Sequence, residues 1–162
     1  MVLAPPAEPG GKFRVLERHQ FRGLDFEAQA EAIRKVTERY NVQHIGIDTT
    51  GIGQGVCQLV KQFFPAARAY QYSVDVKTRL VLKAKSVISK GRLEFDAGAV
   101  DLAQAFMAIK KVLTTSGRQA TYDAGRNNET GHADLAWACM HAMDFEPLEG
   151  ASEATTSVLE FS

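Results

Sequence analysis

The stretch HIGIDTTGIGQGV, from His44 to Val56, decides the fold, because a short apolar run ends on an acid, Asp48, and passes directly into a glycine-rich turn. Two kinds of site share this outline: a loop that cradles the phosphates of a nucleotide, and a carboxylate held at the end of a strand to bind metal. In a third interpretation, Asp48 only closes the turn by accepting backbone N–H groups, and the glycines provide the tight geometry.

The glycine spacing argues against the phosphate cradle. A dinucleotide-binding loop has the pattern G-x-G-x-x-G and an acid about 20 residues later. Here Gly51, Gly53 and Gly55 are spaced G-x-G-x-G, and the next predicted strand ends without an acid. A Walker loop ends in Lys followed by Ser or Thr, a pair that this turn lacks.

A second acid favours the metal interpretation. Asp134 lies near the start of the segment GHADLAWACMHAMDF, residues 131–145, which predicts a helix so apolar that most of it must be buried. A buried carboxylate is costly unless it is paired, hydrogen-bonded or bound to metal. One alternative is that Asp134 interacts with the free N–H groups at the start of its own helix. However, an acid at a strand end and another on a late helix are also the parts of a two-metal phosphodiesterase, in which Mg²⁺ or Mn²⁺ ions lie roughly 4 Å apart.

Predicted strands and helices alternate along the chain. After a hairpin with strands in residues 2–6 and 12–21, helices are predicted at residues 25–40, 55–65, 75–91, 100–115 and 131–145, with strands at residues 44–48, 67–72 and 119–126. Asp25 is placed to cap the first helix. This order predicts an α/β fold in which helices cover a mostly parallel sheet that follows an antiparallel hairpin.

Composition sets broad limits. A chain of 162 residues with 45% apolar content is long enough for one domain. Its net charge of zero predicts that any binding to nucleic acid comes from a local patch. Cys57 and Cys139 have no metal-ligand spacing and indicate reduced, buried thiols. No apolar run approaches the roughly 18 residues of a membrane span, so we expect no membrane association and a cytoplasmic location.

Three segments resemble a known family: the strand and glycine turn at residues 44–55, VKTRLVLKAKSVISKGRLEFDAG at residues 76–98, and AGRNNETGHADLAWACMHA at residues 124–142. Over residues 12–150, the sequence closely resembles the C-terminal nuclease domain of the terminase large subunit of tailed bacteriophages. The resemblance implies an α/β, ribonuclease H-like mixed sheet flanked by helices. It also divides the chain into a nuclease domain at residues 1–145 and a flexible tail at residues 146–162.

The resemblance implies a metal-dependent endonuclease that cuts concatemeric double-stranded DNA during genome packaging in the bacterial host. In this family, three acids bind two divalent ions, Mg²⁺ or Mn²⁺. Asp48 matches the second acid and Asp134 the third, whereas the first acid and its strand have no match in the sequence. We therefore expect a domain that lacks its first strand and cuts weakly or not at all by itself. The family's ATPase domain is not in the sequence, and the small terminase subunit and the portal are implied partners.

Further site residues are weaker candidates. His132 is placed to touch the metal or orient water, or else to lie on the surface near the helix start, and Asp123 faces either the site or solvent. Cations of the helix at residues 75–91 form two stripes at about 100° per residue: Arg79, Lys83 and Lys90 on one side, and Lys77, Lys85 and Arg92 on the other. These stripes are predicted to contact DNA phosphates or to form a solvated face.

Two other functions stay open on the sequence. One is another ribonuclease H-like DNA enzyme, such as a junction resolvase. The other is a noncatalytic α/β domain that binds a nucleotide or a partner through its glycine-rich turn.

Overall fold

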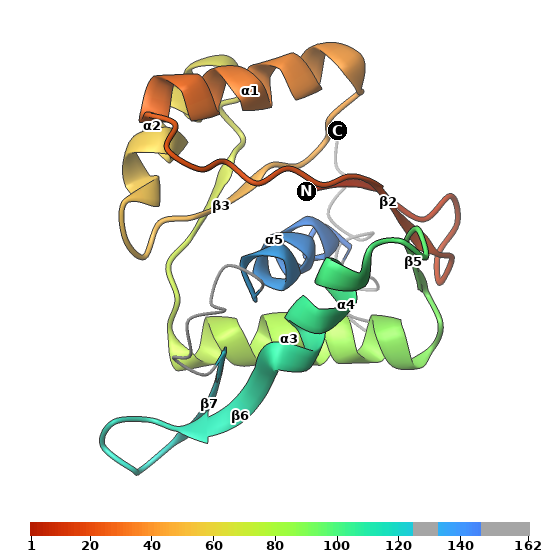
Figure 1. The fold of residues 1–162 in the computed structure, drawn as a ribbon, viewed down its shortest axis with the longest axis vertical. Coiled ribbons are helices and arrows are strands. Elements are labelled where there is room, and N and C mark those ends of the chain that lie inside the picture. The colour runs from red at the N-terminus through yellow and green to blue at the C-terminus, as the bar shows by residue number, and fades with distance from the viewer. Residues whose placement is uncertain (125–132, 147–162) are drawn as a thin grey trace, which may run out of the picture.

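The computed structural model describes residues 1–124 and 133–146, which form helices and short strands in alternation (Figure 1). The strands are β1 (Val2–Ala4), β2 (Phe13–Glu17), β3 (Gly46–Asp48), β4 (Arg68–Tyr70), β5 (Leu93–Glu94), β6 (Ile109–Leu113) and β7 (Ala120–Ala124). The helices are α1 (Phe26–Arg39), α2 (Gly53–Phe63), α3 (Val74–Ser89), α4 (Val100–Ala108) and α5 (Ala133–Met143). The predicted order of elements is confirmed, except that the short strand β5 was not predicted and that residues 100–115 differ.

Local sequence signals set the helix ends. Asp25 caps α1 as predicted, because its Oδ1 accepts the backbone N–H of Ala28 at 2.8 Å. Ser73 caps α3 in the same way, by accepting the N–H of Val76 at 3.2 Å. After α3 the chain turns at Gly91, whose φ of +65° lies in the left-handed region that favours glycine.

The strands of the described residues pair in three separate groups. β1 and β2 form the predicted antiparallel hairpin, and β5 adds to β2 in parallel. β3 and β4 are parallel, with Asp48 opposite Tyr70. β6 and β7 form a second antiparallel hairpin, which extends away from the helices (Figure 1).

The predicted helix at residues 100–115 is wrong in its second half. α4 ends at Ala108, and the chain continues as β6, which pairs with β7 along its whole length. A turn at residues 114–119 joins the two strands, and Gly117 has a φ of +66° there. Cross-strand pairing with β7, which periodicity within residues 100–115 cannot reveal, therefore overrides the local helical pattern.

The buried side chains form two hydrophobic clusters. The larger cluster surrounds α5 and includes residues of α3, α4 and β2. The smaller one consists of Ala30 of α1, Val56 and Val60 of α2, and Ala67 just before β4, and Ile47 of β3 packs against it. The core is therefore divided.

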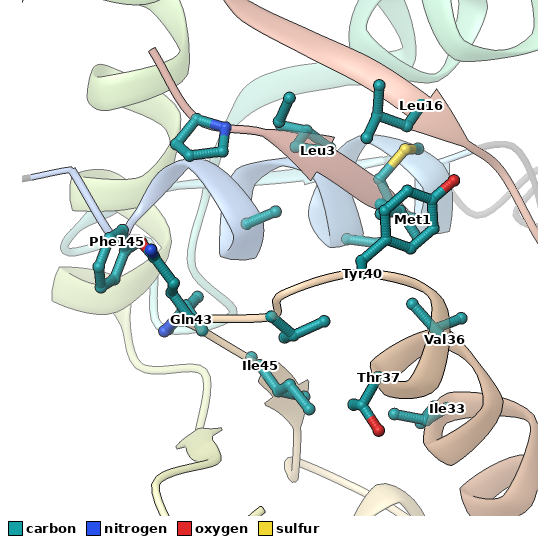
Figure 2. Close-up of a pocket in the computed structure, with 18 of the residues that line it drawn as sticks. Met1, Leu3, Leu16, Ile33, Val36, Thr37, Tyr40, Gln43, Ile45 and Phe145 are labelled. Carbon is teal, nitrogen blue, oxygen red and sulfur yellow. The ribbon is translucent and has the colours of Figure 1, made fainter. Parts of the chain in front are cut away.

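A groove lies between β1 and β3. Its cavity volume is about 520 Å³. Figure 2 shows Leu3 of β1 and the preceding Met1 on one side, Ile45 beside β3 on the other, and Ile33 and Val36 of α1 closing one end. Within residues 1–124 and 133–146, no strand pairs with β1 or β3 across this groove.

Among the described residues, no helix is long and apolar enough to cross a membrane.

Candidate active site

Asp48 lies at the end of β3, where the following turn holds it in place. Its Oδ1 accepts the backbone N–H of Thr50 at 2.8 Å. The N–H of Thr49 donates to the carbonyl of Tyr70 at 2.8 Å, and the N–H of Tyr72 donates to Oγ1 of Thr50 at 2.9 Å. The turn after β3 is therefore tied to the end of β4, which fixes the direction of the Asp48 side chain.

The glycines near Asp48 permit close packing. A Cβ at Gly53 would collide with the carbonyl oxygen of Asp48, so only glycine allows α2 to begin directly beside the strand end. A Cβ at Gly55 would lie 2.7 Å from the ring of Phe26. Packing against the strand end and against α1 therefore accounts for these two glycines without a bound phosphate.

Asp134 lies in the first turn of α5, and α5 packs on β3. The close approach depends on Gly46, where a Cβ would lie 3.0 Å from the Cβ of His141. Asp134 is exposed, whereas the residues on either side of it are buried. The carboxyl end of β3 and the start of α5 thus bring the two acids to one edge of the molecule.

The electrostatics of the site link the two acids. Although Asp134 keeps an exposed surface, desolvation by the groups packed around it raises the pKa of its carboxyl, and the negative charge of Asp48 raises it further. The charges of both acids also act on the phenol of Tyr72: burial raises its pKa most, and Asp48 and Asp134 add to the effect. Sequence analysis missed Tyr72, although its place just after a strand that neighbours β3 was a usable signal.

This donor set fits a divalent cation in part. Carboxylate oxygens are the hard ligands that Mg²⁺ and Mn²⁺ prefer, and a cation between Asp48 and Asp134 would relieve their mutual repulsion. In residues 1–124 and 133–146, no group of three or more His, Cys, Asp or Glu side chains is arranged to hold a metal. The two acids therefore supply some of the ligands that a two-metal site needs.

Of the weaker candidates, Asp123 lies exposed on β7. Its carboxylate is 3.7 Å from Nζ of Lys77, which also lies over the rings of Tyr72 and Trp137. The edge of β7 thus approaches the surroundings of Tyr72, with Lys77 between Asp123 and the two aromatic rings. His132 lies outside the described residues.

Two of the cations predicted to line α3, Lys83 and Arg92, do not lie on a solvated surface. Lys83 is 4% exposed, and its Nζ lies 2.8 Å from Glu146. Arg92 is also buried and lies 2.6 Å from the same carboxylate, while Arg79 pairs with Asp144. The expectation of phosphate contacts from Lys83 is therefore wrong, because residues that follow α5 bury and neutralise it.

Exposed cations lie elsewhere. Lys90 ends α3 and is exposed. Lys110 and Lys111 are exposed on β6, opposite Asp123 and Tyr122 of β7. Sequence analysis placed the lysines of β6 in a helix and so did not consider them as neighbours of Asp123.

The comparisons with known proteins agree with this geometry. Residues 1–145 match the family model described as the terminase RNaseH-like domain. The "Terminase, ATPase subunit" of Escherichia phage P2 is 58% identical over 163 aligned positions, which cover 99% of this chain and 28% of that protein. The "Probable terminase, ATPase subunit" of Haemophilus phage HP1 is 41% identical over 149 positions, covering 91% of this chain and 24% of that protein. The chain thus spans about a quarter of the length of these relatives.

Solved structures share the fold. The large terminase nuclease of thermophilic phage G20c with bound cobalt has a TM-score of 0.57 and 20% identity, over 73% of this chain and 63% of that one. The same nuclease with bound magnesium has a TM-score of 0.54 and 21% identity, over 72% and 61%. Together with the family match, this likeness means that the chain belongs to the terminase ribonuclease H-like domain family.

Proposed function

We propose that this domain is the metal-dependent endonuclease of a phage DNA-packaging terminase large subunit. Its substrate would be concatemeric double-stranded DNA, which it cuts during genome packaging. The observation that carries the proposal is the electrostatic coupling of Asp48 with Asp134 at one edge of a terminase ribonuclease H-like domain. The glycine-rich turn is accounted for by packing, so no feature of it favours nucleotide binding.

Asp48 and Asp134 would hold two divalent ions, Mg²⁺ or Mn²⁺. When bound, such ions activate water and stabilise the leaving oxygen of a phosphodiester. The bound cobalt and magnesium in the phage G20c nuclease structures support this assignment. The protein's own contribution is to hold the two carboxylates in position: Asp48 through the turn tied to β4, and Asp134 through the packing of α5 on β3.

Exposed lysines are the proposed contacts for the DNA backbone. Lys110 and Lys111 lie on the projecting hairpin next to Asp123, and Lys90 lies at the far end of α3. Phosphate contacts of this kind give affinity without reading sequence. Arg79 is a poorer candidate than the sequence indicated, because Asp144 already pairs with it.

The domain would work in the cytoplasm of the bacterial host as part of a larger assembly. The two phage relatives are ATPase subunits about four times as long as this chain, which supports a terminase ATPase domain as its covalent partner. The small terminase subunit and the portal are the further partners that packaging requires.

The test is nicking and linearisation of a supercoiled plasmid by this chain extended at its N-terminus with a segment of the phage P2 relative, with protein in excess, in Mg²⁺ or Mn²⁺ and with a chelator as control. Asp48→Asn and Asp134→Asn should each lower the rate at least about a hundredfold, as expected for loss of a metal ligand. Glu38→Gln is the matched control, because Glu38 is an exposed carboxylate on α1 that pairs with Arg34. Cleavage that survives either Asn substitution would exclude the proposed site.

Asp123→Asn tests the remaining acid. If Asp123 is a third metal ligand, its substitution should lower cleavage as strongly as Asp48→Asn does. If it only pairs with Lys77, the rate should change by less than about threefold, in keeping with the small energy of an exposed ion pair.

A further inference from the structure

Helix α5 carries Asp134, and its buried surface is almost entirely apolar. Eight of its residues are buried, and His141 is the one among them with an ionisable ring. Apolar contacts are not directional, so they constrain the register of a helix less sharply than a hydrogen bond does. Polar contacts with fixed geometry are the usual means of selecting one register.

His141 makes two such contacts near the end of the helix. It is 5% exposed, and its ring stacks on Tyr70 with the ring centroids 4.3 Å apart and the planes 7° from parallel. Its Nε2 lies 2.9 Å from the hydroxyl of Tyr72. Tyr70 ends β4 and Tyr72 follows it, so His141 joins α5 to the strand that pairs with β3.

Asp144 adds a second connection just after the helix. Its side chain is 6% exposed, and its Oδ2 accepts from the hydroxyl of Tyr70 at 2.8 Å and lies 3.2 Å from Arg68. Arg79 of α3 pairs with the other oxygen. A carboxylate at the C-terminal end of a helix is unfavourable for the helix dipole, so the two arginines offset a cost that an apolar residue here would not have.

The position of His141 relative to Asp134 makes this connection relevant to the site. The two residues are seven positions apart, about two helical turns, so they lie on nearly the same face of α5. The negative charge of Asp48 also acts on His141. Any sliding or rotation of α5 that moves His141 away from Tyr72 must therefore also move Asp134 relative to Asp48.

We propose that His141 and Asp144 are positioning residues, which hold α5 in the register that sets Asp134 against Asp48 for metal binding. The inference rests on the proposed function, because it assumes that the two acids share a cation. It assigns the buried Tyr72–His141 and Tyr70–Asp144 hydrogen bonds a role in metal affinity, in addition to their effect on stability.

The experiment measures Mn²⁺ binding by the full chain, independently of cleavage. Trp137 is the single tryptophan and lies one turn after Asp134, so paramagnetic broadening of its indole N–H signal during a Mn²⁺ titration reports metal at the site. Circular dichroism gives the Tm of each variant. Asp48→Asn identifies the part of the broadening that comes from the site.

His141→Phe keeps the stacked ring but removes the hydrogen bond, and Tyr72→Phe removes the same bond from its other end. Each should weaken Mn²⁺ binding about tenfold, the lower end of the loss seen when residues that support metal ligands are changed. The double variant should bind Mn²⁺ almost as well as either single variant, because both substitutions remove the same Tyr72–His141 hydrogen bond. His141→Gln, which can still bond to Tyr72, should recover part of the affinity, and Asp144→Asn should weaken binding as well.

Tyr40→Phe is the matched control, because Tyr40 donates a 2.7 Å hydrogen bond to Glu17 away from the site. It should lower the Tm slightly and leave Mn²⁺ binding unchanged. If His141→Phe and Asp144→Asn lower the Tm while Mn²⁺ binds as in the unaltered chain, the two residues are structural and the inference is overturned. If Asp48→Asn and Asp134→Asn leave the broadening unchanged, the proposed metal site itself fails, which is a different result.

Discussion

Nζ of Lys83 lies 2.8 Å from the carboxylate of Glu146, and the lysine side chain is 5% exposed. The pair joins the middle of α3 to the residues that follow α5, across 63 positions of sequence. Arg92 donates to the other oxygen of the same carboxylate at 2.6 Å. Glu146 thus pairs with two buried cations through its two carboxylate oxygens, and the folded domain includes it.

The first prediction is that Lys83→Ala destabilises the domain without altering DNA binding directly. Arg92 still pairs with Glu146 in this variant, so the expected cost is that of one lost hydrogen bond between charged groups, about 2 kcal/mol. Lys85→Ala, at an exposed position on the same helix, should cost less than about 0.5 kcal/mol. Urea denaturation measures the free energy of unfolding of both variants.

The salt dependence of duplex binding separates this role from a phosphate contact. Lys110→Ala and Lys111→Ala should each lower the slope of log affinity against log salt by about one. At a temperature where the variant is folded, Lys83→Ala should leave the slope unchanged. A lower slope for Lys83→Ala would mean that Lys83 does contact DNA phosphates.

The second prediction concerns Gly46, which lies between two buried rings. An added Cβ would lie 2.7 Å from Cε2 of Tyr70 and 3.0 Å from Cβ of His141, and Tyr70 is 2% exposed, so its ring has little room to move. Gly46→Ala should therefore destabilise the domain by about 1–3 kcal/mol, as overpacking does. It should also weaken Mn²⁺ binding, because α5 would be pushed away from β3.

Gly51→Ala provides the comparison, since a Cβ at Gly51 meets nothing within 4 Å. Thermal unfolding of the two variants, each with the Mn²⁺ titration, is the measurement. Equal stability of Gly46→Ala and Gly51→Ala would mean that the approach of α5 to β3 is looser than the structure has it.

The third prediction is a loss of stability in mild acid that depends on His141. Burial lowers the pKa of His141 to about 4, opposed by the charges of Asp48 and Asp144 and assisted by those of His44 and Arg79. The unfolded chain binds the proton near pH 6.5. Between these two values the unfolded state holds more protons than the folded state, so the free energy of unfolding falls as the pH falls.

The contribution of His141 to the free energy of unfolding is complete above about pH 6.5. It should decrease by roughly 3 kcal/mol as the pH approaches 4. Urea denaturation between about pH 4.5 and 7 measures it, in a window above the usual range of carboxylate titration. His141→Phe should flatten the dependence on pH. If the slope of the Phe variant equals that of the unaltered chain, other groups cause the loss.

Much of the fold follows from local sequence signals. The cap at Asp25, the turn at Gly91 and the alternation of strands and helices all act over a few residues, so they were readable from the sequence. The two acids Asp48 and Asp134 were found because acids next to apolar segments are costly unless they have partners.

The errors concern contacts between distant segments. β6 was assigned to a helix because its pairing partner, β7, follows a turn and lies outside the helical window. Lys83 was assigned to a solvated stripe because its partner, Glu146, belongs to the segment predicted to be a flexible tail. In both cases tertiary contacts decided the structure, and no periodicity within one segment carries that information.

The last prediction concerns the groove between β1 and β3. Backbone groups on the edges of two strands face a cavity of about 520 Å³, and no strand of the described residues pairs with them there. Unpaired strand edges recruit other strands, and an open apolar groove lowers stability. We therefore expect this chain either to have low stability or to associate with a second copy through the groove, which sedimentation over a range of concentrations would detect.

An added strand should fill the groove and stabilise the site. This chain covers 28% of the phage P2 relative, and its resemblance to a C-terminal domain implies that residues precede the matched region there; these residues can be fused in front of Met1. The fused chain should have a higher Tm and slower amide hydrogen exchange at Leu3 and Ile47, on the two sides of the groove. An acid on the added strand would join Asp48 and Asp134, and three carboxylates hold two divalent ions against their mutual repulsion better than two do.

Plasmid cleavage in Mg²⁺ or Mn²⁺ should therefore be weak or absent for the 162-residue chain and clear for the fused chain. Cleavage by the fused chain should be lost with Asp48→Ala, with Asp134→Ala and with a chelator. A fusion of the same length and composition in scrambled order is the control, because it adds residues without a strand pattern matched to the groove. Strong, chelator-sensitive cleavage by the 162-residue chain alone would mean that its metal site is already complete, and that the groove has no part in assembling it.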